Sequence, residues 1–167
     1  MEYPARVTRE GKFVLASFPD CPGCQTFVRE GGNIESMARD ALIGWLEVTL
    51  DSDDIPTRPR QYRSVKGTEM IHIPVPVPLA VRLELRWLRA LYDLTQADVA
   101  RSTGMSQQQI ARLEGPRGNP TVDTLERLAK GLGVSLKIAF DLTGRSRYED
   151  KRTPRSATRR RRAMTSR

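Results

Sequence analysis

Apolar side chains recur at helical spacing in the segment that follows Asn33. Residues three or four apart lie on the same face of a helix, so the pattern predicts an apolar stripe on a helix that runs to about Leu50. Asn33 is a favoured N-cap residue for such a helix. The simplest way to bury the stripe is to pack the helix on a small antiparallel sheet. The stripe consists of Ile34, Met37, Ala38, Ala41, Leu42 and Trp45.

Short apolar runs on either side of this helix are typical of β-strands. Gly11 can adopt the positive φ of a tight hairpin between the first two runs, and Cys21-Pro22-Gly23-Cys24 has the residues of a turn. Met70–Val77 contains prolines, which sheets tolerate at their edges, so we expect an edge strand there. The three runs before the helix are Tyr3–Thr8, Phe13–Phe18 and Gln25–Arg29.

The second half of the chain has the pattern of several short helices. Apolar spacing predicts a first helix from Val81 to about Tyr92. Gly104 separates the next two helices and suits the left-handed residue that ends a helix. Two short helices joined by such a turn form a helix-turn-helix. The remaining predicted helices are Gln96–Thr103, Gln107–Glu114 and a fourth that follows Thr121 and ends near Leu132.

Apolar and polar residues alternate in Ser135–Asp141, which predicts a short C-terminal strand rather than another helix. An unpaired strand at a domain edge is free to pair with a second copy of the chain. We therefore expect a homodimer or a higher homo-oligomer. A two-fold dimer of a DNA-binding helix-turn-helix would present two recognition helices to DNA half-sites about one helical turn apart.

The positive charge is concentrated at the end of the chain. The 167 residues carry a formal net charge of +8. Residues 144–167 hold ten basic and two acidic side chains, so this segment accounts for the whole excess, whereas residues 1–78 are slightly acidic. The segment lacks the apolar residues of a core, so we expect a disordered arginine-rich tail. This tail is either a solvated end with no dedicated role or a clamp that strengthens contacts with nucleic-acid phosphates.

Three groups of reactive side chains are candidates for chemistry. Cys21 and Cys24 could form a redox pair or half of a zinc site, but zinc needs four ligands and only His72 remains to help. His72 has no nearby Ser or Cys partner, so a partly buried strand histidine is favoured over a general base. A two-metal nuclease needs carboxylates on rigid neighbouring elements, whereas three of the available five share one loop. The five are Asp20, Glu47, Asp51, Asp53 and Asp54.

These patterns favour a protein with no catalytic residue, no metal and no cofactor. The longest uncharged run, Met70–Val81, is too short and too rich in proline to span a membrane. The N-terminus lacks the basic stretch and apolar core of a signal peptide. Two cysteines cannot form a disulfide framework, so we expect a cytoplasmic protein.

Residues at fixed spacing carry a resemblance to a known family. The pattern includes Leu94-Thr95-Gln96, Val99-Ala100, Gly104-Met105-Ser106, Ile110, Leu113-Glu114 and Asn119-Pro120-Thr121. It resembles the Cro/repressor-type helix-turn-helix family over roughly Val81–Val134. The resemblance implies that the third helix enters the major groove of double-stranded operator DNA.

The same resemblance assigns roles to particular positions. Gln107, Gln108, Gln109 and Arg112 would face the bases, and Ser106 together with Gln96 would hold phosphates. A glutamine amide matches adenine N6 and N7, and arginine matches guanine O6 and N7. Three successive glutamines cannot all face the groove, so Gln107 and Gln108 are favoured over Gln109.

The first half resembles the HicB antitoxin family. The resemblance rests on Tyr3-Pro4-Ala5, Gly11-x-Phe13, Phe18-Pro19-Asp20, Pro22-Gly23-Cys24 and a long helix that ends near Ile55-Pro56. It implies a partial ribonuclease-H-like domain without catalytic activity. It further implies an antitoxin of a type II toxin–antitoxin system that binds and blocks a small basic HicA-type ribonuclease toxin and represses its own operon. Phe18, Asp20 and Trp45 are the candidate toxin contacts.

Taken together, the sequence predicts an α+β chain. Residues 1–60 form the toxin-binding domain, 61–80 a linker with an edge strand, 81–143 the helix-turn-helix domain with its short strand, and 144–167 the disordered tail. Two other functions remained open. One is a transcription regulator whose N-terminal domain senses a small molecule, and the other is a ribonuclease-H-like nuclease.

Overall fold

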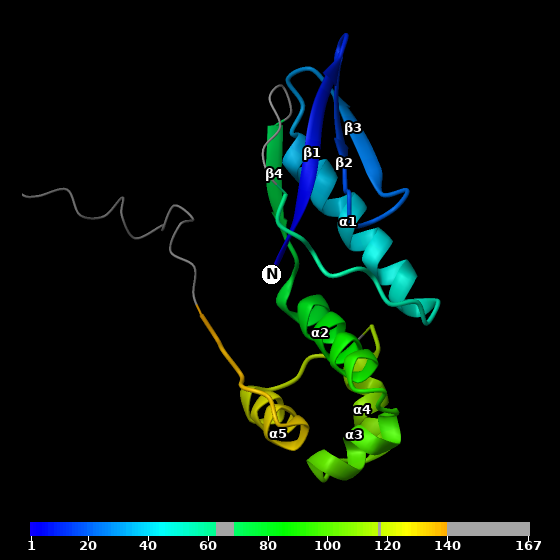
Figure 1. Cartoon of the computed structure of the whole chain (residues 1–167). Helices are drawn as coiled ribbons and strands as arrows, with labels where there is room; N and C mark the ends of the chain where they lie inside the picture. The colour runs from blue at the N-terminus through cyan, green and yellow to red at the C-terminus, as the bar shows by residue number, and fades with distance from the viewer. Residues whose placement is uncertain (63–68, 117, 140–167) are drawn as a thin grey trace, which may run out of the picture. The chain divides into compact units, whose positions relative to one another are not determined.

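The computed structural model describes residues 1–62, 69–116 and 118–139. Met1–Leu136 form one compact unit. A four-stranded sheet and a long helix come first, and four shorter helices follow (Figure 1). The elements are β1 (Glu2–Glu10), β2 (Phe13–Ser17), β3 (Gln25–Arg29), α1 (Ile34–Asp51), β4 (Glu69–Pro74), α2 (Val77–Leu91), α3 (Gln96–Thr103), α4 (Gln107–Glu114) and α5 (Val122–Leu132).

The sheet is antiparallel throughout, in the order β3-β2-β1-β4. Gly11 adopts a φ of +59° in the tight turn between β1 and β2. β4 pairs with β1 at the edge of the sheet, and its proline, Pro74, is the last residue of the strand. The three predicted N-terminal strands and the predicted edge strand are therefore confirmed.

Helix α1 packs against one face of the sheet. The Asn33 side chain accepts a hydrogen bond of 3.0 Å from the Ser36 amide and so caps the helix as predicted. The buried residues of α1 are four apart along one face, whereas Met37 from the predicted stripe is 42% exposed. This buried line, Ala38, Leu42, Leu46 and Leu50, packs in one cluster with Tyr3, Ala5, Ala16 and Ile73 of the sheet.

Helix α2 begins at Val77, earlier than the predicted start at Val81. A proline in its first turn explains this start, because the fixed φ of proline suits the beginning of a helix, where its missing amide costs nothing. The helix contributes to two separate apolar clusters. Leu79, Leu83 and Trp87 pack with α1 and the sheet, whereas Leu85 packs with α3, α4 and α5.

Helices α3 and α4 form the predicted helix-turn-helix, with the predicted boundaries. Gly104 ends α3 in the left-handed conformation, with a φ of +64°. α5 packs closely on α3 at Gly131, where an added Cβ would lie 2.6 Å from the Thr103 Cγ2 atom. The second cluster consists of Leu85, Val99, Ala100, Ile110, Leu113 and Leu128.

The end of the described chain differs from the expectation. Residues 134–139 belong to neither a helix nor a strand, so the strand predicted for Ser135–Asp141 is absent from the part that is described. Alternation alone does not make a strand, because its backbone groups need a partner to pair with, and the described residues supply none. The predicted tail, 144–167, lies outside the described residues. No helix among the described residues is long and apolar enough to cross a bilayer.

Candidate nucleic-acid interface

Helix α4 turns one face to the core and the other to solvent. Ile110 and Leu113 are buried in the second cluster, because they lie three apart on the inner face. Gln107, Gln108 and Arg112 are exposed. Gln109 is exposed as well, so the structure leaves all four residues predicted to read bases accessible at the surface of the helix-turn-helix.

Gln109 and Ser106 hold the start of α4. The Ser106 amide donates to Gln109 Oε1 at 2.8 Å, and the Gln109 amide donates to Ser106 Oγ at 3.1 Å. This reciprocal capping box satisfies two amides that a helix start otherwise leaves unpaired. One end of the Gln109 side chain, its Oε1, is thus engaged within the protein, and the preference for Gln107 and Gln108 as base-reading residues stays a prediction.

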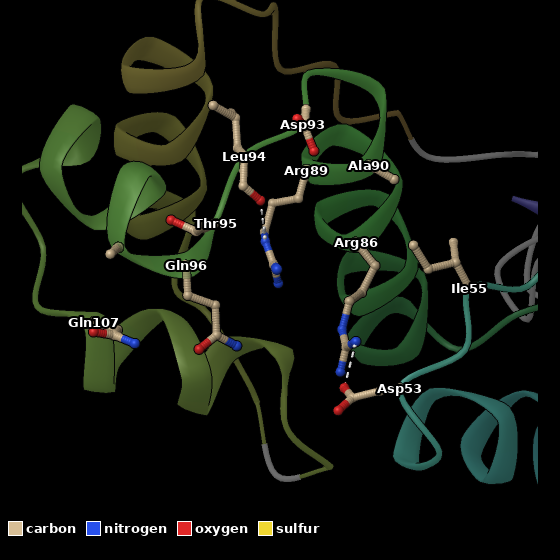
Figure 2. Close-up of a pocket in the computed structure, with 11 residues that line it drawn as sticks. Asp53, Ile55, Arg86, Arg89, Ala90, Asp93, Leu94, Thr95, Gln96 and Gln107 are labelled. Carbon is tan, nitrogen blue, oxygen red and sulfur yellow. Dashed lines mark hydrogen bonds and ion pairs between the residues drawn. The ribbon is translucent and has the colours of Figure 1, made fainter.

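Gln96 lies at the start of α3 and is half-buried. Its Nε2 donates to Glu114 Oε2 at 3.0 Å, so part of its side-chain amide is already used inside the protein. Gln96 and Gln107 both line a pocket of about 590 Å³ (Figure 2). The structure therefore brings one predicted phosphate contact and one predicted base contact to the same pocket.

Glu114 is a functional candidate that the sequence analysis missed. It is the last residue of α4, and its side chain is only 2% exposed. Its Oε2 lies 3.2 Å from Arg86 Nε and is also paired with Arg89 Nη1. A buried carboxylate requires such cationic partners, since burying it alone is very unfavourable. The signal that could have found it is the pair of arginines three apart on the predicted helix that precedes Gln96.

A second set of ion pairs joins α2 to the end of α1. Arg82 is buried; its Nη2 lies 3.2 Å from Asp51 Oδ1, and its Nε donates to the Glu114 carbonyl at 3.0 Å. Arg86 Nη1 lies 2.9 Å from Asp53 Oδ1 (Figure 2). The Glu114 carbonyl at the end of α4, which has no partner within the helix, thus accepts a hydrogen bond from Arg82, and Arg82 also pairs with Asp51 of α1.

The candidate toxin contacts are mostly interior residues. Phe18 is 3% and Asp20 4% exposed. Asp20 accepts hydrogen bonds from the Arg60 amide at 2.9 Å and the Tyr62 hydroxyl at 2.6 Å, and the latter bond raises the pKa of Tyr62. Phe18 and Asp20 therefore present little surface to a partner in this structure, and their contact with a toxin stays a prediction. Trp45 is half-buried, and its Nε1 donates to the Pro22 carbonyl at 3.2 Å.

The two cysteines form the predicted turn. The Cys24 amide donates to the Cys21 carbonyl at 2.9 Å, and Gly23 between them has a φ of +80°. Both thiols are free and buried, and burial raises the pKa of Cys21 to about 12 and that of Cys24 to about 11. Such thiols are poor nucleophiles near neutral pH.

The other side chains considered for chemistry are not gathered into a site in the part of the chain that the structure describes. His72 is exposed on β4, rather than partly buried as expected, because it lies on the face of the strand opposite Ile71 and Ile73. Over the described residues, no three His, Cys, Asp or Glu side chains are close enough to hold a metal ion. The five carboxylates weighed as a nuclease cluster therefore do not converge there.

Comparison with known proteins identifies the class. The helix-turn-helix family model matches residues 85–138. Residues of this chain are 35% identical over 57 positions to the HTH-type transcriptional regulator MJ0272 of Methanocaldococcus jannaschii, covering 34% of this chain and 86% of that protein. The chain belongs to the helix-turn-helix family.

A longer similarity includes the first half. The chain is 29% identical over 146 residues to Antitoxin HicB 1 of Photorhabdus laumondii, covering 84% of this chain and 88% of the antitoxin. It is 27% identical over 142 residues to Antitoxin HicB of Escherichia coli strain K12, covering 84% and 99%. It is thus a homologue of the HicB antitoxins, and the resemblance stated from sequence is confirmed.

Proposed function

We propose that this protein is the antitoxin of a type II toxin–antitoxin pair that also represses its own operon. Its N-terminal half would bind and neutralise a HicA-type ribonuclease that cleaves mRNA, and its helix-turn-helix would bind operator DNA, both in the cytoplasm. The observation that carries the proposal is the exposed outer face of α4 in a chain similar to HicB antitoxins over 84% of its length.

The DNA-reading part of the proposal assigns roles to exposed side chains of α4. Gln107 and Gln108 would read adenine through their amides, and Arg112 would read guanine through its guanidinium. Ser106 and Gln96 would lie beside phosphates, where their remaining donors are available. A homodimer would present two copies of α4 to half-sites about one turn of DNA apart.

The toxin-binding part rests on the N-terminal half. Among Phe18, Asp20 and Trp45, Trp45 is half-buried and the other two are buried. Residues 1–78 are slightly acidic, which suits a small basic partner. A few complementary charges of this kind mainly raise the rate of encounter and exclude wrong partners.

The test of the antitoxin role uses the full chain and the small basic protein encoded by the neighbouring reading frame. We expect the two to purify as a complex in which cleavage of mRNA is abolished. A neighbouring protein that cleaves mRNA equally well with and without this chain would refute the antitoxin role, as would the absence of any such reading frame.

The test of repression uses a duplex of the DNA directly upstream of the operon. The double variant Gln107→Ala, Gln108→Ala should lose preferential binding to this duplex while it still inhibits the ribonuclease. The alternative regulator would instead require a small molecule that shifts the affinity for DNA with no protein partner present. Such a shift, without ribonuclease inhibition, would decide for that alternative.

A further inference from the structure

The contacts of α2 suggest a residue that controls DNA reading without facing DNA. We propose that Arg82 is a positioning residue for α4, which it fastens to α1 through Asp51. This inference rests on the proposed DNA-binding function. It assigns to the N-terminal half a direct part in holding the recognition helix.

Arg82 has the geometry of a two-sided connector. Its side chain is 4% exposed, and its guanidinium has one acceptor on each of two separate segments. Nε donates to the backbone carbonyl of Glu114, and Nη2 donates to Asp51 Oδ1. A guanidinium holds two acceptors in a fixed fork, whereas an ammonium group would bind them as a flexible point charge. The position of the end of α4 is therefore defined relative to the end of α1.

Arg86, one helical turn further along α2, makes a parallel connection. Its Nη1 pairs with Asp53 at 2.9 Å, its Nη2 donates to the Leu50 carbonyl at 3.4 Å, and its Nε lies 3.2 Å from Glu114 Oε2. Both arginines thus join the end of α1 to Glu114. If the carboxylates of Asp51 and Asp53 were neutralised, charge pairing from α1 would be lost while the contacts between α2 and Glu114 remained.

The connection lies beside the proposed reading surface. Asp53, Gln96 and Gln107 line the same pocket, and Figure 2 shows them around it. Glu114 and Gln107 are the two ends of α4, so a displacement at one end changes the direction in which the other points. A recognition helix that is held in its bound orientation before it meets DNA loses less entropy on binding. Loss of the connection should therefore reduce discrimination between sequences.

The test compares two full-length double variants. Asp51→Asn, Asp53→Asn replaces two carboxylates, whose side chains are 57% and 89% exposed, by neutral amides, so the charge pairing with Arg82 and Arg86 is lost and the fold should persist. The control, Glu47→Gln, Asp54→Asn, removes an equal number of negative charges from the same helix and the same loop. Neither residue has an ion pair within the described residues. The probes are the upstream duplex and a scrambled duplex of equal length. Thermal unfolding checks that each variant is folded.

The readout is the dissociation constant for the scrambled duplex divided by that for the upstream duplex, so a larger ratio means better discrimination. Loss of two acidic charges should strengthen binding to any DNA to a similar extent in both variants, and this effect cancels in the ratio. We expect Asp51→Asn, Asp53→Asn to reduce the ratio about tenfold and the control to leave it within about twofold. Amide exchange in the last turn of α4 should be faster in the first variant alone.

Equal ratios in the two variants would overturn the role of Arg82 while leaving the proposed function intact. The wild-type protein tests that function separately. If it bound both duplexes equally, the DNA-reading proposal itself would fail. A reduced ratio with faster exchange at the end of α4 supports the positioning role.

Discussion

Gly131 tests how closely α5 must approach α3. In Gly131→Ala the new Cβ would lie 2.6 Å from Thr103 Cγ2, 2.8 Å from Thr103 Cα and 2.8 Å from the Ser102 carbonyl oxygen. Favourable contacts between carbon atoms begin at about 3.5 Å. Two of these three neighbours are backbone atoms of α3, which cannot rotate away as a side chain can. The helices must therefore move apart, and overpacking of this kind costs about 1–3 kcal/mol.

Helix propensity opposes this cost. Replacing glycine by alanine in a helix gains up to about 1 kcal/mol, and less here because Gly131 is the residue before the end of α5. We expect a net loss of stability of about 1–2 kcal/mol. For a chain of this size, that corresponds to a fall in Tm of about 2–8 °C.

Gly44 provides the matched control. It lies in α1, and an added Cβ would meet no atom within 4 Å. Gly44→Ala should therefore gain about 0.5–1 kcal/mol from propensity alone. Thermal and urea unfolding followed by circular dichroism measure both variants. If the Tm of Gly131→Ala rose as much as that of Gly44→Ala, the close contact between α3 and α5 would be refuted.

Three further predictions concern DNA and the thiols. Gln107→Ala should cost about 1–3 kcal/mol on the upstream duplex and relax base preference; an equal loss on scrambled DNA would contradict base reading. Removal of residues 144–167 should weaken binding to any duplex and flatten its salt dependence, measured by titration at several salt concentrations, because ten basic side chains are lost. With pKa values raised to about 12 and 11, Cys21 and Cys24 should stay protonated at pH 8 and react slowly with iodoacetamide until urea unfolds the chain. Rapid labelling of the native protein, seen by mass spectrometry, would refute their burial.

Features determined by local sequence were predicted well. The bounds of α3 and α4 and the role of Gly104 between them were predicted correctly, because Thr95 and Ser106 begin these helices through capping boxes whose members lie three residues apart. These interactions are close in sequence, so residue spacing reveals them. The apolar line of α1 was less well placed, because Leu46 and Leu50 rather than Met37 continue it.

Features determined by pairing between distant segments were missed. Nothing in the spacing of residues says that Arg82 meets both Asp51 and Glu114, since each partner is about thirty residues away. The burial of Asp20 likewise depends on Tyr62, which is distant in sequence. The alternation in Ser135–Asp141 resembles that of a strand, but the pattern reports which faces are apolar and not whether a pairing partner exists.

Helix α2 packs in both apolar clusters, and this limits how segments can be exchanged between this chain and its relatives. A cut at Val81 would take Leu83 and Trp87 away from the sheet and α1, and would leave both fragments with uncovered apolar surface. Trp87 would also lose the Pro56 carbonyl to which its Nε1 donates. An exchange of DNA-reading segments between relatives therefore needs to transfer α2 together with matching residues of α1, so that specificity for DNA and the N-terminal half are inherited as a pair.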